Sequence, residues 1–407
     1  MLFSVAWKNI WRNKLRSLIV IFAIVIGLFG GLYGSAIMLG MVDQRIRLAI
    51  ANEVSNIQIH QKDFILNKEL KDTIPDMTRL KGVLDSMHTI KAYTCRLKVV
   101  GMASSATNGL GVMINGIDPD REKLVTDIYK SIPDSLGSWF GDRRKNQVVI
   151  GHKLMEKLKV KPRSKIVLIF QDDSGNMVSG AFKITGVYRT SNTSFDETNI
   201  FVSRSDLQTL LGFRSERSHE ISIALNDDGT NAADVSTLGK ISSDLSVMGW
   251  KEIMPDLGMM NDMMMMWLYL VMVIILLALS FGIINTMMMS VLERTRELGM
   301  LMAVGMNRRR VFIMIMLESV MLSLCGGLLG MGISALVIQL SSRYGVDLST
   351  FGKGMEDMGF SAIAYPMLGT GFYIGLTALV ILTGILSSLM PARRALKLKP
   401  VEAIRIL

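Results

Sequence analysis

Cysteine and histidine are scarce in this chain, which removes the material for several common kinds of site. Cys95 lies in a polar region and Cys325 in an apolar run, so we expect no disulfide framework. No HExxH, CxxC or GxSxG motif occurs, and no spacing assigns a metal site or a catalytic pair. We therefore expect no metal and no catalytic residue, and we interpret the histidines as surface or core residues: His60, His88, His152 and His219.

Charge is almost absent from four long stretches of the sequence. Residues 17–39, 267–292 and 367–390 carry none, and residues 311–340 carry only Glu318. A helix needs about 20 apolar residues to cross a bilayer, and each stretch is longer. We predict four transmembrane helices. The first is not a cleaved signal peptide, because it is too long and follows a basic helix.

Basic residues gather in three short segments beside these stretches. Residues 1–16, 293–310 and 391–407 together carry fourteen basic and three acidic residues, whereas residues 40–263 carry 29 and 28. Because basic loops stay on the cytoplasmic side, both termini and the loop 293–310 are expected there, with residues 40–263 and 341–366 outside. The net charge of +10 therefore indicates a membrane, with its lipids as partners, and no nucleic acid.

The first sixteen residues are amphipathic. Large apolar side chains, including Trp7 and Trp11, share one helical face, and the basic residues lie elsewhere. This pattern predicts an elbow helix in the cytoplasmic interface. The alternative is a plain extension of the first transmembrane helix.

The residues between the first two transmembrane helices are too many for a loop and predict a folded α+β domain, with two lobes. Residues 41–55 would continue the first helix outward, and with segment 227–263 would form the lobe nearest the membrane. Alternating and β-branched runs predict strands at 57–60, 91–102, 111–117, 147–150, 164–171, 177–188, 198–202 and 220–225. Helical patterns are found at 79–87, 153–158, 205–211 and 232–245.

Three features of the apolar segments leave alternatives open. The methionine-rich run 259–266 is interpreted as an adaptable helix rather than a copper site. Glu318 is expected to have a structural role near the cytoplasmic face rather than to relay protons. The glycines of residues 326–332 would allow close helix approach, within one subunit or across a dimer.

The loop 293–310 is too short for a domain, yet it is not a simple turn. Leu298, Leu301, Met302 and Met306 give a short apolar face, flanked by charged residues. Such a helix at the cytoplasmic surface predicts a partner groove. The alternative is an interfacial helix without a partner.

Three segments of the chain resemble signatures of one family. ERTRELGMLMAVGMNRRRV (293–311) resembles the coupling loop of the FtsX-like permease superfamily, which includes MacB-type exporters, the lipoprotein-releasing permeases LolC and LolE, and FtsX. PARRALKLKPVEAIR (391–405) is similar to its C-terminal signature, and AWKNIWRNKLRSLI (6–19) to its elbow. Segments 111–122 and 149–160 resemble the external domain of MacB-like and lipoprotein-releasing members. The layout resembles the lipoprotein-releasing permeases most.

The resemblance implies a permease that dimerises with an identical or homologous permease and receives two ABC ATPase subunits on its cytoplasmic loops. The ATPase would contact the loop through Leu298, Gly299, Leu301, Ala303 and Gly305, bordered by Glu293, Arg294 and Glu297. No GxxxxGK[S/T] motif occurs in the 407 residues, so we expect no cofactor here, and ATP and Mg²⁺ on the partner. MacB carries a fused ATPase domain upstream of its elbow, and this chain begins with the elbow.

These expectations define nine segments in a bacterial inner-membrane protein with a periplasmic domain. They are the elbow 1–16, the transmembrane helices 17–40, 264–292, 311–340 and 367–390, the periplasmic domain 41–263, the coupling loop 293–310, the periplasmic loop 341–366 and the tail 391–407. We expect a non-enzymatic permease that couples ATP hydrolysis elsewhere to movement of a lipoprotein or other amphipathic cargo, by mechanotransmission. The alternatives are MacB-like efflux with a periplasmic adaptor and FtsX-like activation of a cell-wall hydrolase.

Overall fold

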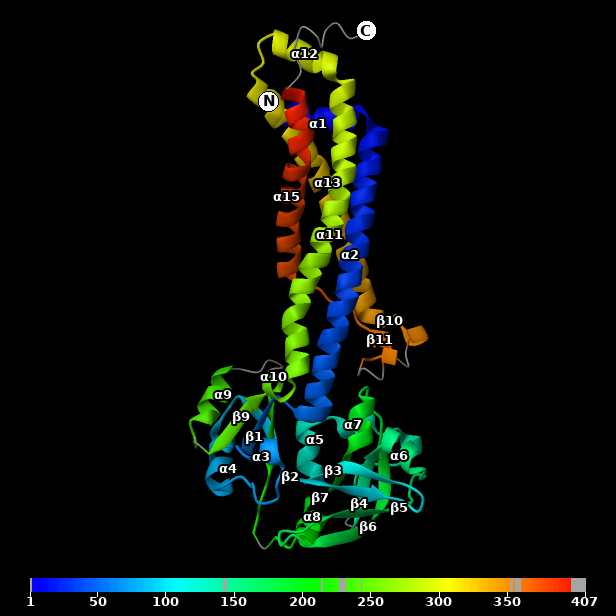
Figure 1. Cartoon of the computed structure of the whole chain (residues 1–407), viewed down its shortest axis with the longest axis vertical. Helices are drawn as coiled ribbons and strands as arrows, with labels where there is room; N and C mark the ends of the chain where they lie inside the picture. The colour runs from blue at the N-terminus through cyan, green and yellow to red at the C-terminus, as the bar shows by residue number, and fades with distance from the viewer. Residues whose placement is uncertain are drawn as a thin grey trace. The chain divides into compact units, whose positions relative to one another are not determined.

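The computed structural model describes residues 2–141, 145–213, 215–226, 232–242, 244–351, 354–355 and 360–396. These residues divide into two compact units (Figure 1). We call the first, drawn from residues 2–41, 262–347 and 363–396, the helical unit. We call the second, drawn from residues 42–261 and 348–362, the outer domain. Residues 397–405 of the C-terminal signature and the end of the predicted tail lie outside the described residues.

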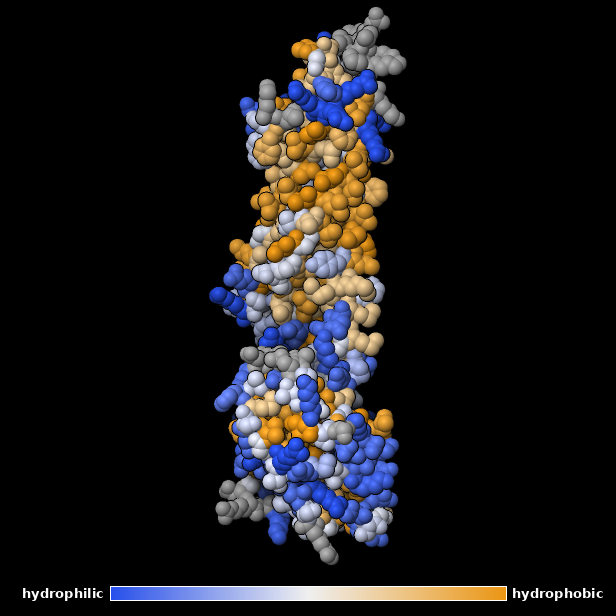
Figure 2. All heavy atoms as spheres, turned by 90° about the vertical axis from the view of Figure 1, so that its left-hand side faces the viewer, coloured by the Kyte–Doolittle hydropathy of each residue, from blue (hydrophilic) through white to orange (hydrophobic). Residues whose placement is uncertain are grey.

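Four long apolar helices confirm the expected membrane architecture. Each is long and apolar enough to cross a bilayer, and the outer domain is inserted between the first and the second. They are α2 (Lys14–Ala49), α11 (Pro255–Glu293), α13 (Arg308–Tyr344) and α15 (Thr370–Leu396). Figure 2 shows hydrophobic side chains over the middle of these helices and hydrophilic ones at the end with the short helices α1 (Leu2–Arg12) and α12 (Thr295–Ala303).

Glycines let α2 and α15 pack closely against α13. A Cβ at Gly326 would lie 2.9 Å from Ile24, and one at Gly330 would lie 3.2 Å from Leu28. On the other side, a Cβ at Gly327 would lie 2.9 Å from Val380. These three glycines therefore serve packing within the chain. A Cβ at Gly332 would meet no described atom within 4 Å.

The elbow is a helix separate from α2. α1 ends at Arg12, a turn follows, and α2 begins at Lys14, so the elbow is not a plain extension of α2. The Ser17 hydroxyl closes the turn by donating to the Ile10 carbonyl at 2.6 Å. Ala6 and Ile10 are buried in the helical unit. Trp7 and Trp11 are partly exposed and meet edge to face, with ring centroids 5.9 Å apart.

Six strands of the outer domain form a closed ring around the larger apolar core. Each strand of the ring pairs with the next, in the order β2-β3-β7-β4-β6-β5 and back to β2. Every second side chain of a strand faces this core. On Lys165–Gln171, for example, Ile166, Leu168 and Phe170 are buried and their neighbours point outward. The strands are β2 (Ile90–Ser104), β3 (Gly109–Ile117), β4 (Gln147–Gly151), β5 (Lys165–Gln171), β6 (Met177–Tyr188) and β7 (Asn199–Ser203).

The second lobe of the outer domain is a four-stranded antiparallel sheet in the order β2-β8-β1-β9. β2 joins the lobes, because residues 90–96 pair with β8 and residues 97–104 pair with β3. A second apolar core lies between this sheet and two helices. The elements are β1 (Ile57–Gln61), β8 (Glu220–Leu225), β9 (Leu245–Gly249), α4 (Met77–Ser86) and α9 (Ala232–Gly239).

The expected strands occur within two residues of their predicted ends, and one helix prediction is wrong. The helix expected over 232–245 ends at Gly239, and β9 follows it. Glycine favours a helix end, and Leu245–Gly249 pairs with β1 over its full length, so tertiary pairing overrides the helical pattern. The remaining short elements are η1 (Ile50–Val54), α3 (Phe64–Asn67), α5 (Pro119–Val125), η2 (Ile128–Ser131), η3 (Asp134–Leu136), α7 (Thr193–Thr198), α10 (Trp250–Ile253), β10 (Val346–Asp347), η4 (Ser349–Phe351) and β11 (Ile363–Ala364). The helices expected near 153–158 and 205–211 are α6 (His152–Leu158) and α8 (Arg204–Leu211).

Candidate functional site

The loop between α11 and α13 is built around the short helix α12. Arg294 breaks the helical path after Glu293, and α12 begins one residue later. The helix ends at Ala303, and the chain turns at Gly305, whose φ of +102° favours glycine. Asn307 then caps α13 by accepting a hydrogen bond from the Arg309 amide at 3.1 Å. Two turns therefore hold α12 apart from both long helices.

The residues expected to contact a partner are divided between two faces of α12. Leu298 and Gly299 are buried against the helical unit. Leu301, Ala303 and Gly305 are exposed. Met300 and Val304 are exposed beside them, Val304 to 89%. We call these five exposed residues the α12 patch: Met300, Leu301, Ala303, Val304 and Gly305.

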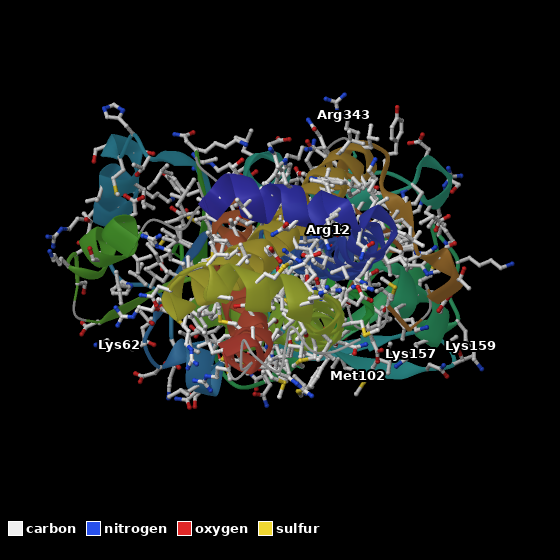
Figure 3. All side chains as sticks on the ribbon, turned by 90° about the horizontal axis from the view of Figure 1, so that it is seen from above. Arg12, Lys62, Met102, Lys157, Lys159 and Arg343 are labelled. Carbon is white, nitrogen blue, oxygen red and sulfur yellow. The ribbon has the colours of Figure 1, made fainter. Side chains whose placement is uncertain are left out.

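The charged residues that were expected to border the docking helix are occupied by contacts within the helical unit. Arg12 donates two hydrogen bonds, of 2.8 and 2.6 Å, to the Glu297 carboxylate. Arg16 donates two, of 2.8 and 2.5 Å, to Glu293. Figure 3 shows Arg12 on α1 beside α12. The Arg12–Glu297 pair fixes α12 against α1, and the Arg16–Glu293 pair fixes the end of α11 against α2.

Glu318 is the buried member of this set of contacts. Its carboxylate accepts hydrogen bonds from Arg294 at 3.1 and 3.2 Å and from the Asn9 amide at 2.5 Å. Arg294 also contacts Glu297 at 3.3 Å, so one arginine connects α12 to α13. The Arg12 hydrogen bond lowers the pKa of Glu297, which keeps that carboxylate charged. We call the five residues the elbow network: Asn9, Arg12, Arg294, Glu297 and Glu318.

A second charge cluster lies inside the outer domain. Arg96 on β2 donates to Glu122 on α5 at 2.5 and 3.2 Å and to Glu220 on β8 at 2.7 Å. Lys98 also pairs with Glu220, and His60 lies 3.7 Å from it. Burial opposes the charge of Glu220, but Lys98 and Arg96 lower its pKa well below the ordinary value. Arg96 and Lys98 balance the charges of Glu122 and Glu220, so removal of any one of them would leave an uncompensated buried charge.

The part of the chain that the structure describes holds no candidate metal site, and the thiol of Cys95 is buried. No group of three or more His, Cys, Asp or Glu side chains there could hold a metal ion. Cys95 is buried in the core of the four-stranded lobe, and burial raises the pKa of its thiol. A thiol with a raised pKa is less ionised at neutral pH and therefore a weak nucleophile.

Family models match both units of the chain. The model of the MacB-like periplasmic core domain matches residues 17–238, more than half of the chain. The model of the FtsX-like permease C-terminal region matches residues 269–400. The chain belongs to the MacB/FtsX-like permease family. This confirms the expected superfamily and the membrane-helical architecture with an inserted α+β domain.

Similar proteins come from several bacteria. The chain is 25% identical to the uncharacterized ABC transporter permease YknZ of Bacillus subtilis, over 98% of this chain and 97% of that protein. It is 24% identical to the pyoverdine export ATP-binding/permease protein PvdT of Pseudomonas fluorescens, and 24% identical to the macrolide export ATP-binding/permease protein MacB of Escherichia coli. The matches cover 98% of this chain in both cases, but 58% and 60% of those proteins.

Solved structures of related external domains also match. The periplasmic region of MacB from Actinobacillus actinomycetemcomitans aligns with a TM-score of 0.35 and 13% identity, over 50% of this chain and 92% of that one. The extracellular domain of YknZ from Gram-positive bacteria aligns with a TM-score of 0.32 and 15% identity, over 48% and 99%. The family matches support a MacB/FtsX-type ABC transporter permease that crosses the inner membrane several times. They do not distinguish a lipoprotein-releasing branch.

Proposed function

We propose that this chain is the membrane subunit of an ABC transporter whose ATPase is a separate chain, and that the ATPase binds the α12 patch. The observation that supports this is the exposure of Met300, Leu301 and Val304 on a short helix between two transmembrane helices. Adjacent exposed apolar side chains indicate a contact surface for another protein. The 407 residues contain no P-loop motif, so ATP and Mg²⁺ are assigned to the partner.

The contacts around α12 support a proposed path for mechanical coupling. The elbow network links α12 to α1 and α13, and the Arg16–Glu293 pair links α2 to the end of α11. A partner that moves α12 would therefore act on all these helices together. α2 and α11 lead into and out of the outer domain along the chain, so they are the elements that would carry the movement to it.

The proposed cargo is an amphipathic molecule taken up on the outer side of the membrane. The names of two relatives, which concern macrolide and pyoverdine export, favour export of small molecules. A periplasmic adaptor is part of this proposal. A lipoprotein is the second cargo that we propose. The working unit would be two permeases with two ATPase subunits, with both permease termini in the cytoplasm.

Docking is tested by placing charge in the α12 patch. The variants L301D and V304D are expected to lose the copurifying ATPase while remaining in the membrane, because a buried carboxylate opposes an apolar contact. Leu66 in the outer domain is exposed to 84%, so L66D introduces the same charge on a surface outside the patch and serves as the matched control. Normal ATPase copurification with both patch variants would refute the assignment. Gly305 is unsuitable, because its positive φ would strain any replacement.

Cargo is tested on the complete complex from native membranes. Mass spectrometry of molecules retained by the complex should find an export substrate or a lipoprotein. A complex that retains neither, but stimulates a cell-wall hydrolase, would replace the transport proposal with FtsX-like activation.

A further inference from the structure

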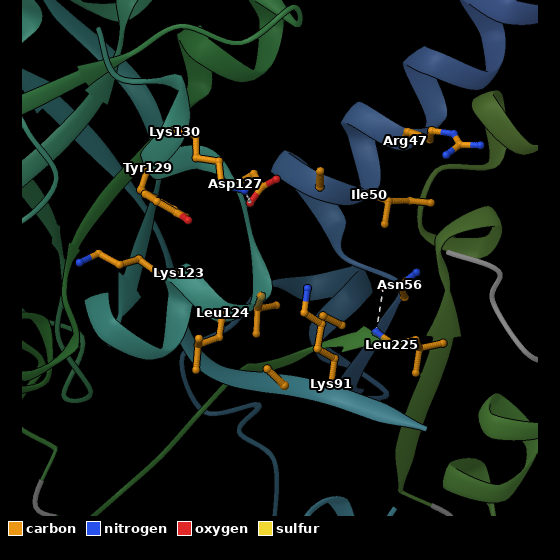
Figure 4. Close-up of a pocket in the computed structure, with 14 residues that line it drawn as sticks. Arg47, Ile50, Asn56, Lys91, Lys123, Leu124, Asp127, Tyr129, Lys130 and Leu225 are labelled. Carbon is orange, nitrogen blue, oxygen red and sulfur yellow. Dashed lines mark hydrogen bonds and ion pairs between the residues drawn. The ribbon is translucent and has the colours of Figure 1, made fainter. Parts of the chain in front are cut away.

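A basic pocket in the outer domain lies apart from both charge clusters. Its volume is about 450 Å³. Figure 4 shows Lys91 of β2 between the segment of Lys123 and Tyr129 on one side and Ile50 on the other. The lining includes four cationic residues and a single acidic one, Asp127. The cationic residues are Arg47, Lys91, Lys123 and Lys130.

The cations of this pocket are unequally neutralised. Lys130 pairs with Asp127 at 2.7 Å, and Arg47 pairs with Asp43 at 2.7 Å. Lys123 has a longer contact of 3.8 Å with Asp120, whose side chain is 95% exposed. Lys91 has no ion-pair partner among the described residues. The pocket therefore holds uncompensated positive charge, whereas residues 40–263 as a whole are almost balanced.

Neutral donors and a rigid wall accompany the charge. Asn56 is buried, and its side-chain oxygen accepts from the Leu225 amide at 3.0 Å, which leaves its NH₂ group as a donor (Figure 4). Tyr129 contributes a hydroxyl to the lining. The Asp127 amide donates to the Ala51 carbonyl at 2.8 Å, which ties the residues between α5 and η2 to η1, the segment that follows α2. A preformed pocket loses little entropy when it binds a ligand.

We propose that this pocket binds a phosphate ester. An ammonium group with amide and hydroxyl donors suits the several acceptor oxygens of a phosphate. The pocket is larger than a bare phosphate requires. Its apolar wall, formed by Ile50, Leu124 and Val125, would contact the organic part of the ester. The ester is either a lipid headgroup or a soluble metabolite. Arg47 comes only eight residues after Leu39, the end of the first uncharged stretch. Because the pocket is close in sequence to a membrane helix, the probes include a lipid.

The test uses the purified full chain in a neutral detergent and isothermal titration calorimetry. The probes are glycerol 3-phosphate, inorganic phosphate and short-chain phosphatidylglycerol. We expect at least one probe to bind, and K91Q to weaken that binding by about tenfold, the size of one charge-assisted hydrogen bond. Y129F should weaken it less, because it removes a neutral donor.

The control is K165Q on β5, an exposed lysine that does not line this pocket. Binding of phosphatidylglycerol alone would identify a lipid headgroup, and binding of the soluble probes would identify a metabolite. No binding by any probe, or equal affinities in K91Q and K165Q, would overturn the proposal. The result does not depend on whether an ATPase binds α12.

Discussion

Removal of Arg294 should destabilise the helical unit far more than removal of a neighbouring arginine. Arg294 contacts Glu318 at 3.1 Å, and their side chains are only 14% and 6% exposed. The variant R294Q leaves a buried carboxylate with Asn9 as its remaining partner. Breaking a buried ion pair costs about 3–5 kcal/mol of stability. Because Glu318 keeps its hydrogen bond from Asn9 and the pair is partly exposed, we expect R294Q to lower the free energy of unfolding by about 2–3 kcal/mol.

Thermal unfolding of the purified chain in detergent measures this effect. About 2–3 kcal/mol corresponds to a midpoint lowered by roughly 5–10 °C for a unit of this size. The double variant R294Q/E318Q should recover most of the loss, because it removes the stranded charge. Arg296, two residues further along on α12, is exposed and provides the control R296Q, which should shift the midpoint little. Equal shifts in R294Q and R296Q, or no recovery in the double variant, would refute the reasoning.

Three further predictions concern the elbow, the outer domain and the membrane orientation. The side chains of Arg12 and Glu297 are 55% and 40% exposed, so their ion pair is partly screened by solvent. A double-mutant cycle in detergent should give a coupling energy of about 0.5–1 kcal/mol that weakens in high salt. No coupling in low salt would contradict the forked pair. Burial raises the pKa of the Asp196 carboxyl to about 7. The folded protein therefore binds this proton more tightly than the unfolded chain, and the resulting stability is complete below pH 4. As the pH rises from 4 through 7 this stability is lost, and the free energy of unfolding falls by at most about 1.4 kcal/mol per pH unit. D196N should therefore flatten the pH dependence of unfolding between pH 4 and 7, and a curve parallel to the wild type would argue against a raised pKa. A reporter fused after Leu407 should be active in the cytoplasm and one inserted near Gly175 in the periplasm, whereas the reverse pattern would invert the topology.

The architecture could be predicted from the sequence because the patterns that indicate it extend over many residues. Uncharged stretches locate the four membrane helices because the bilayer requires an extended apolar surface. Period-two alternation locates most strands, as in Lys165–Gln171, where every second residue enters the core. The sequence does not show that β2 joins two lobes. Residues 97–104 of β2 pair with β3, which follows directly, but residues 90–96 pair with β8, which is distant in the chain.

The candidate site was harder to predict because it depends on which face of α12 is covered. Leu298 and Leu301 looked equivalent in the sequence, yet packing buries Leu298 and leaves Leu301 exposed. Met300 and Val304 were missed, although their four-residue spacing places them on one face with Leu301. The partners of Glu293, Arg294 and Glu297 come from α1, α2 and α13, and such distant pairs leave no local pattern.

The most direct test of the central proposal is the mass spectrometric composition of the tagged chain purified gently from its native membrane. We predict an ABC ATPase together with this permease, in equal numbers of subunits. A second, similar permease with bound lipoproteins would indicate a lipoprotein extractor, and a periplasmic adaptor would indicate MacB-like export. Absence of any ATPase under conditions that keep the permease dimeric would contradict the docking role of α12 and the transport function proposed from it.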